Sequence, residues 1–105
     1  MDKIAILNQI LAQNPSDAFA RYGLAMEKLG RNDAAGALEE FDLLNTQNPD
    51  YTPAFQMAAQ TLAKLGRNDE ARQRLVAGIA CAQRTGNRHA QAEMQVLLDD
   101  IELGI

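Results

Sequence analysis

The 105-residue sequence has no tryptophan, one cysteine, one histidine and only 5% aromatic residues. A lone cysteine cannot form a disulfide within the chain, which excludes the small disulfide-stabilised domains that are common among secreted proteins. One cysteine and one histidine also fall short of the three or four ligands that a zinc site usually needs. We therefore expect no metal site and no bound cofactor.

There is also no excess of positive charge, because 10 Lys and Arg stand against 14 Asp and Glu and give a formal net charge of −4 at pH 7. Nucleic-acid-binding proteins usually carry a basic patch, so we expect no nucleic acid partner. No apolar run reaches the length that crosses a membrane. The N-terminal residues lack the charged flank, apolar core and cleavage site of a signal peptide. These absences predict a cytoplasmic protein that contacts no membrane.

The residues that could carry chemistry do not form a recognisable catalytic motif. His89 is the one candidate histidine base, but a base needs a nucleophile and an orienting acid within reach. Cys81 falls on or beside an apolar helical stripe, where a free cysteine is usually a small buried hydrophobe. Three acids near the C-terminus, Asp99, Asp100 and Glu102, are interpreted as a solvated polar cap. We therefore expect a protein that is not an enzyme.

What the sequence does contain is helix-forming residues in a repeating pattern. Much of its 47% hydrophobic content is Ala and Leu, with few of the β-branched residues that favour strands. Apolar residues recur at spacings of three and four, and Gly, Asn and Pro interrupt them. The pattern predicts an all-α protein of six helices: one in residues 2–13, two in 14–47, two in 48–84 and one in 87–103. Because the connections are short, consecutive helices should pack as antiparallel αα-hairpins.

Small and large side chains fall in register in the two predicted hairpins. The first reads Phe19-x2-Tyr22-Gly23-x2-Met26, then Ala37-x3-Phe41 and Pro49, and the second reads Phe55-x2-Ala58-Ala59-x2-Leu62, then Ala71-x3-Leu75. With its period near 34 residues, this pattern resembles the tetratricopeptide repeat of small bacterial proteins. The resemblance implies that the small residues allow two helices to approach closely and that the large residues fill the space beside them.

The resemblance covers nearly the whole chain and implies a single domain of residues 1–105. In that domain the antiparallel hairpins would stack into a right-handed superhelix. Residues 2–13 would be half of a repeat, 14–47 and 48–84 would be two repeats, and 87–103 would be a C-terminal capping helix.

Two landmarks of the sequence disagree about the period. The six residues KLGRND occur at 28–33 and again at 64–69, which are 36 positions apart, whereas Asn-Pro recurs after 34 positions, at 14–15 and 48–49. We interpret the difference as a deletion of two residues in the loop before the second helix, cancelled by an insertion of two residues before the third helix.

This interpretation has local consequences. The second helix should begin early, at Pro15, with Asn14 as its N-cap. The third helix should gain about half a turn at its N-terminus. Gly36 falls in the inserted stretch and is either a site of close packing or part of an irregular turn. Three glycines are expected to end helices: Gly30, Gly66 and Gly86.

The resemblance also implies a function. In this family the first helix of each hairpin lines a concave face that binds a peptide or helix of another protein. The positions expected to line this peptide-binding groove are Ala20, Leu24, Glu27, Lys28, Gln56, Gln60, Ala63 and Lys64. Lys28 and Lys64 would occupy equivalent places in the two hairpins and favour an acidic group in the ligand.

A structural role is the alternative, either as a self-associating scaffold or as a subunit of a larger assembly. Val96 lies on the outer side of the last predicted helix and could belong to such a contact. We accordingly expect a monomer or a weak homo-oligomer whose partner is a protein or peptide.

Overall fold

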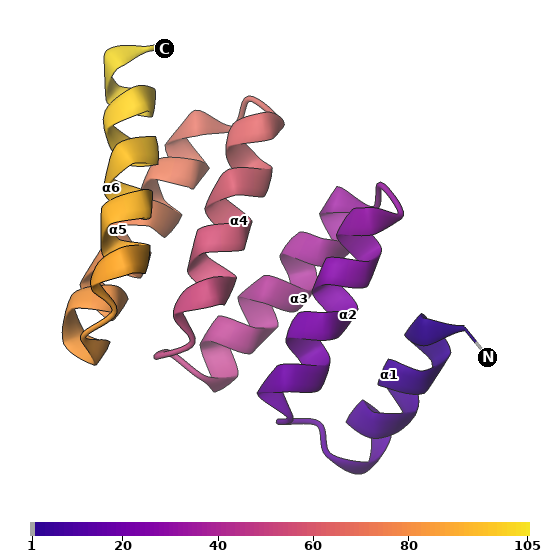
Figure 1. The fold of residues 1–105 in the computed structure, drawn as a ribbon. Helices are drawn as coiled ribbons and strands as arrows, with labels where there is room; N and C mark the ends of the chain where they lie inside the picture. Colours follow the sequence, from indigo (N-terminus) through magenta and orange to yellow (C-terminus); the bar gives the residue numbers. More distant parts are fainter. Residues whose placement is uncertain (1) are drawn as a thin grey trace. The chain divides into compact units, whose positions relative to one another are not determined.

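The computed structural model describes residues 2–105, which form six α-helices and, over that range, no strand (Figure 1). The helices are α1 (Lys3–Gln13), α2 (Ala18–Gly30), α3 (Ala34–Gln47), α4 (Thr52–Lys64), α5 (Asn68–Thr85) and α6 (Arg88–Leu103). The predicted all-α hairpin fold is confirmed. The chain divides into two compact units, unit 1 (Met1–Asn48) and unit 2 (Pro49–Ile105), which are described separately below.

Unit 1 consists of the hairpin α2–α3 with α1 packed against α2. The hairpin closes around side chains that are 0–1% exposed: Ala25, Ala37, Phe41 and Leu44. Tyr22 adds a tilted contact with the ring of Phe41, with 6.0 Å between the ring centroids. A second cluster joins α1 to α2 through Leu11, Ala20 and Leu24. The small alanines let the helices approach closely, and the large side chains then fill the remaining space.

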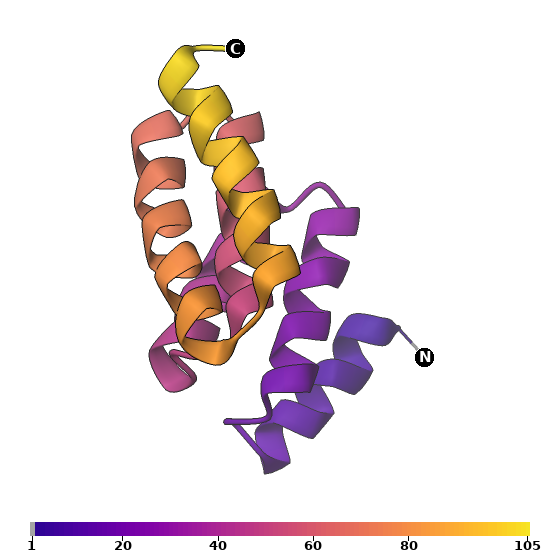
Figure 2. The same ribbon diagram turned by 60° about the vertical axis from the view of Figure 1, so that its left-hand side comes forward.

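Unit 2 consists of the hairpin α4–α5 with α6 packed over it (Figure 2). Its core includes Ala59, Leu75, Ala82, Met94 and Leu98, which are all at most 9% exposed. Gly86 ends α5 in the left-handed conformation, with φ 73°, as predicted. The side chain of Asn87 then caps α6 by accepting a hydrogen bond from the backbone N–H of Ala90 at 3.1 Å.

The two hairpins repeat with an exact period of 34 residues, so the predicted deletion and insertion are wrong. The first residue of α4 comes 34 positions after the first residue of α2, and their last residues are also 34 positions apart. The first residue of α5 likewise comes 34 positions after the first residue of α3. The turns obey the same period, because the left-handed residues are Asn32 (φ 63°) and Gly66 (φ 76°). In both turns the N–H of the residue directly after the left-handed one returns to the helix: Asp33 donates to the carbonyl of Lys28, and Arg67 to that of Leu62, both at 2.9 Å.

The two copies of KLGRND are therefore not structurally equivalent, because the second copy stands two residues later in the repeat than the first. In the first copy Asn32 adopts the left-handed conformation, because Asn is among the few residues besides Gly that tolerate it. Gly30 remains the last residue of α2 instead of ending it with a left-handed turn. Only in the second copy does the glycine, Gly66, stand at the turn. Lys28 consequently matches the buried Leu62, and it does not match Lys64.

The start of α2 also differs from the prediction. Its N-cap is Asp17, whose carboxylate accepts a hydrogen bond from the N–H of Ala20 at 3.0 Å, so the helix begins three residues after Pro15. Phe19 was expected to fill the hairpin core, yet it is 84% exposed. The regular period explains this result, because Arg21 stands in the place that Phe55 takes in the second hairpin.

Gly36 is neither a helix-packing site nor part of an irregular turn. Its N–H donates to Oδ1 of Asp33 at 2.9 Å, which makes Asp33 the cap of α3. A Cβ built at Gly36 would stand 2.2 Å from the other oxygen of that carboxylate. The glycine therefore makes room for the capping side chain at the start of a helix whose N-terminus is not extended.

Candidate functional site

In unit 2, four of the predicted groove residues form one stripe along α4. Gln56, Gln60, Ala63 and Lys64 follow the spacing i, i+4, i+7 and i+8, which places them on a single helical face. The first three are half-buried and Lys64 is exposed. The neighbouring face of α4 carries Ala58, Ala59 and Leu62 into the core. The stripe is thus held in place by a tightly packed helix and remains accessible.

A matching stripe runs along α6, with Glu93, Leu97 and Ile101 at successive intervals of four residues. Gln56 connects the two stripes at one end, because its amide Nε2 donates to Oε1 of Glu93 at 3.4 Å. Glu93 also lies 3.2 Å from Nε2 of His89, one turn earlier on α6. The lone histidine is thereby an exposed partner of a carboxylate.

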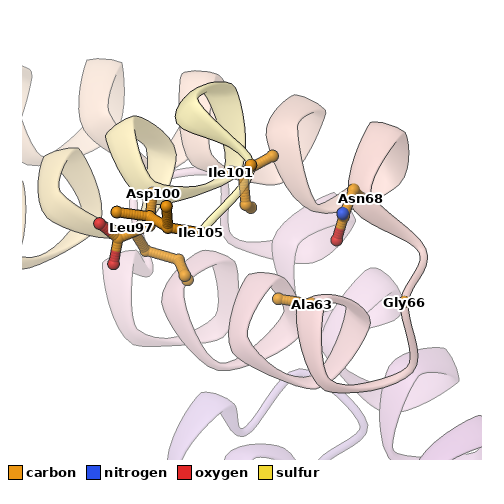
Figure 3. A pocket seen from close by; sticks show the side chains of 8 residues that line it. Ala63, Gly66, Asn68, Leu97, Asp100, Ile101 and Ile105 are labelled. Atoms are coloured by element: carbon orange, nitrogen blue, oxygen red, sulfur yellow. The ribbon is translucent and has the colours of Figure 1, made fainter.

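A cavity of about 320 Å³ lies at the other end of the two stripes (Figure 3). Ala63 on α4 and Leu97 and Ile101 on α6 give it apolar walls. Asn68, at the start of α5, and Asp100 contribute polar groups. The remaining lining residues are Gly66, Gly104 and Ile105. We call the two stripes and this cavity the α4–α6 surface.

Local sequence fixes the shape of this cavity. Helix α4 ends at Lys64, and Gly66 turns the chain with φ 76°, a conformation in which a side chain would be strained. No atom lies within 4 Å of the place that a Cβ on Gly66 would take, so the glycine serves the turn and leaves this part of the wall open. Asn68 follows two residues later as the first residue of α5.

The unit 1 half of the predicted groove needs correction. Ala20 and Leu24 are only 3% and 2% exposed, so they offer a ligand almost no surface. Helix α1 covers this side of α2, where Leu11 joins them in the core and Ile4 and Leu7 pack around it. The prediction failed because the register was taken from KLGRND, which displaces the faces of α2 by two residues.

Lys28 also has a different role from the predicted one. Its ammonium group lies 2.8 Å from Oε2 of Glu40 on α3, and Arg21 lies 2.8 Å from Oε1 of the same carboxylate. Arg21 further donates to the backbone carbonyl of Pro15 at 2.9 Å. The two cations and Glu40, which is 13% exposed, form an ionic cluster between α2 and α3. Lys28 is therefore bound to α3 within the hairpin.

Glu27 lies closer to α1. Its carboxylate forms an ion pair with Arg31 at 3.3 Å, and Arg31 also binds Asp2, just before α1. The hydrogen bond from Arg31 lowers the pKa of the Asp2 carboxyl below 3.8. Of the unit 1 groove residues, only Glu27 and Lys28 keep partial exposure, and both are ion-paired.

The stripe on α6 was missed by reasoning from the sequence. Asp100 was interpreted as part of a polar cap, and it lines the same cavity as Leu97 and Ile101, which also pack against the core of unit 2. The spacing of four residues was visible in the sequence. What the spacing could not show is which helix the stripe faces, since this depends on the packing of α6 across the end of α4.

The described residues contain little that suggests catalysis. Within residues 2–105, no three His, Cys, Asp or Glu side chains are placed so that they could share a metal ion. Cys81 is buried, and its Sγ lies 3.1 Å from Oγ1 of Thr52. None of the helices in this range has the length and apolar character needed to cross a membrane.

Comparison with known proteins gives a consistent result. A family model described as tetratricopeptide repeat matches residues 28–94. The chain is 29% identical over 96 residues to the TPR repeat-containing protein PA0015 of Pseudomonas aeruginosa, and the match covers 91% of each chain. A tetratricopeptide repeat domain protein from Salinibacter ruber has a similar structure, with a TM-score of 0.79 and 31% identity, covering 85% of this chain and 90% of that one.

A more distant likeness is to PcrH, whose crystal structure is a complex with the chaperone binding region of PopD. The TM-score is 0.88, and the match covers 95% of this chain and 76% of PcrH. At 17% identity this likeness shows a shared fold alone.

Proposed function

Because the chain belongs to the tetratricopeptide-repeat family, we propose that it is a non-enzymatic protein-interaction module whose α4–α6 surface binds an extended segment of a partner protein. The observation that carries this proposal is the cavity of about 320 Å³ at the end of two aligned stripes. Stacked helical hairpins often use such surfaces for binding.

The side chains of the surface suit a peptide in an extended conformation. The side-chain amides of Gln60 and Asn68 offer hydrogen-bond donors and acceptors to backbone groups of a ligand. The carboxylate of Asp100 offers further acceptors. Leu97 and Ile101 give one apolar side chain of the ligand a place to be buried. Lys64 is exposed at the rim, where it would favour an acidic group. One cation gives only a weak preference for acid, because Glu93 and Asp100 lie on the same surface.

The structure of PcrH supports this proposal. PcrH holds the chaperone binding region of PopD, which means that a fold of this kind can accommodate a segment of another protein. The buried free thiol of Cys81 further suits a reducing compartment, and we propose that the protein is cytoplasmic.

Peptides selected from a random library against the full chain would test the proposal. Ala63→Arg fills the cavity and should weaken the binding of selected peptides at least about tenfold, whereas Val76→Arg, on an exposed position of α5, should leave affinity within about twofold. Lys64→Glu is an additional variant at an exposed position that should not disturb the core. Binding that survives Ala63→Arg in a folded variant, together with amide shifts confined to other surfaces, would disprove the assignment.

Self-association is the second candidate function. Val96 and Leu103 are 59% and 73% exposed, and their separation of seven residues places them on one outer face of α6. Light scattering over a range of concentrations separates the two functions. A constant monomer mass favours the interaction module. A mass that rises with concentration, and that Val96→Asp returns to the monomer value, favours the scaffold.

A further inference from the structure

The cavity of the α4–α6 surface combines an apolar wall with a carboxylate. Asp100 follows Leu97 by three residues and directly precedes Ile101, so the three side chains occupy one side of α6. All three line the cavity of about 320 Å³, and all three are half-buried. Figure 3 shows Leu97 and Asp100 at one side of the cavity and Asn68 at the other. A ligand that covers Leu97 and Ile101 therefore also comes close to Asp100.

The carboxylate of Asp100 is available for a ligand. In the described part of the chain it has neither a hydrogen-bond partner nor an ion-pair partner. Neighbouring carboxylates on α6 differ in this respect. Glu93 accepts a hydrogen bond from the side chain of Gln56 at 3.4 Å. Asp99 accepts one from the side chain of Gln95 at 2.9 Å.

The charge of α6 points to a cationic ligand group. From residue 89 to residue 105 the sequence has no lysine or arginine, and its four acidic residues are Glu93, Asp99, Asp100 and Glu102. Charges of one sign along the wall of a cleft raise the local concentration of oppositely charged groups. The net charge of −4 for the whole chain acts in the same direction.

We propose that this cavity binds a basic side chain, arginine or lysine, of the partner segment. The aliphatic stem of that side chain packs against Ala63, Leu97 and Ile101, and its charged head group forms an ion pair with Asp100. Long basic side chains are suited to such a site, because they bury their methylene groups along apolar surfaces and keep the charge at the tip. The inference rests on the proposed function, since it names the residue that the bound segment inserts into the cavity.

An apolar or acidic side chain fits this cavity less well. Leucine or phenylalanine would pack against Leu97 and Ile101, but it would remove water from the Asp100 carboxylate without replacing the lost hydrogen bonds. An acidic side chain would bring two like charges together. Lys64 does not line the cavity, so its preference for an acidic group concerns a different residue of the ligand.

Arginine should bind more tightly than lysine. The planar guanidinium group can donate two parallel hydrogen bonds to one carboxylate, and it is more weakly hydrated than an ammonium group. Asn68, across the cavity from Asp100, then remains available for the backbone of the ligand (Figure 3).

Peptides selected from a random library against the full chain supply the probe. Those whose binding is lost in Ala63→Arg should be enriched in arginine or lysine at one position. The tightest of them would be synthesised as a pair that differs only at that position, with arginine in one peptide and citrulline in the other. Citrulline has nearly the length and shape of arginine but no charge, so the pair separates the ion pair from packing.

We expect citrulline to weaken binding to the wild-type chain about tenfold. Asp100→Asn should weaken binding of the arginine peptide about tenfold and of the citrulline peptide less than about twofold, because the charge of Asp100 matters only opposite a cation. Higher ionic strength should weaken binding of the arginine peptide more than that of the citrulline peptide.

Glu102→Gln is the matched control for Asp100→Asn. It removes the same charge from α6 at an exposed position that does not line the cavity. It should change the affinity for either peptide by less than about twofold. The exchange of arginine for citrulline needs no variant of the protein, so it tests the ion pair even if Asp100→Asn fails to fold.

Two results would overturn this inference and leave the proposed function intact. One is that peptides sensitive to Ala63→Arg show no preferred basic residue or bind equally well with citrulline. The other is that Asp100→Asn and Glu102→Gln weaken the arginine peptide equally, since the effect would then come from the general charge of α6. If no selected peptide is sensitive to Ala63→Arg, the proposed function fails and this inference fails with it.

Discussion

At the scale of single residues, the glycines of this chain serve different purposes that depend on their surroundings. Gly66 permits a left-handed turn, Gly36 leaves room for a capping carboxylate, and Gly78 allows two helices and a methionine to meet. Gly30 does none of these, since a Cβ built there meets no atom within 4 Å. The four positions therefore predict different responses to the same substitution.

Gly78→Ala should destabilise unit 2 by about 1–3 kcal/mol. A Cβ at this position would stand 2.6 Å from Sδ of Met94 and 2.8 Å from Cβ of Phe55, and the second atom is too close to a backbone to move freely. Gly30→Ala is the matched control and should stabilise the protein by up to about 1 kcal/mol, because alanine favours the helical conformation. Chemical denaturation measures both. Equal effects of the two substitutions would contradict the assignment.

Glu40→Gln should destabilise unit 1 by about 1.5–3 kcal/mol, the usual strength of hydrogen bonds to charged groups. The change would leave the mostly buried cations Arg21 and Lys28 facing a neutral amide. Nε of Arg21 already lacks a hydrogen-bond partner, so the cluster has no spare acceptor to offer. Glu39→Gln, on the exposed neighbouring residue, should change the free energy of unfolding by less than about 0.5 kcal/mol. A small loss for both variants would show that the ionic cluster contributes little.

At the scale of helices, identical positions in the two hairpins are occupied by different chemistry. Arg21, Lys28 and Glu40 form an ionic cluster where the second hairpin has Phe55, Leu62 and Arg74. The helices nevertheless begin at the same intervals, and α2 and α4 also end 34 positions apart. The geometry of the repeat is thus maintained by the small residues at the helix crossings and by the left-handed turns, which leaves the other interhelical positions free to vary.

The contact of α1 with the end of α2 should weaken in acid. In the folded chain Arg31 lowers the pKa of the Asp2 carboxyl from 3.8, so this ion pair stabilises the fold fully above pH 3.8 and less as the pH falls through the lowered value. The protection of α1 amides, measured relative to their intrinsic exchange rate at each pH, should therefore fall below about pH 4. Asp2→Asn should remove that acid dependence and show faster exchange at neutral pH, whereas Glu70→Gln, in unit 2, should leave α1 unchanged. Identical pH profiles for the wild type and Asp2→Asn would refute this role.

At the scale of the whole molecule, the acidic composition governs behaviour in solution. The net charge is −4 at pH 7 and the isoelectric point is about 4.8. Exposed apolar side chains remain at several places, including Phe19, Val96, Leu103 and Ile105. Electrostatic repulsion opposes association through these side chains at neutral pH.

We expect solubility to be lowest near pH 4.8, where this repulsion vanishes. Static light scattering between pH 4 and 7 would record the rise in mass. Phe19→Ser removes the most exposed aromatic side chain and should reduce association near the isoelectric point, whereas Phe41→Ser would test only unfolding, because that ring is buried. Scattering that is independent of pH would contradict this expectation.

The fold class, the number of helices and most helix ends could be predicted from the sequence, although α2 begins three residues after its predicted start. Helix periodicity, caps and glycine turns are local properties, and the match of Ala37 and Phe41 with Ala71 and Leu75 at 34-residue intervals agrees with the family that the comparison identifies. The unit 2 half of the groove stripe, from Gln56 to Lys64, was also predicted as one face because spacing alone sets which residues share a side of a helix.

The packing of the helices was needed to show which of the two possible periods is real and which helix faces are open. The identical letters of KLGRND favoured a register displaced by two residues, and on a helix two positions turn a side chain by about 200°. That displacement placed Ala20 and Leu24 on an open face that α1 in fact covers, and Phe19 in a core from which it is excluded. Which faces stay open depends on which helices are present to cover them. A sequence pattern shows that a helix has an apolar face, but only packing shows whether, as with Ile6 and Ile10, that face stays partly exposed.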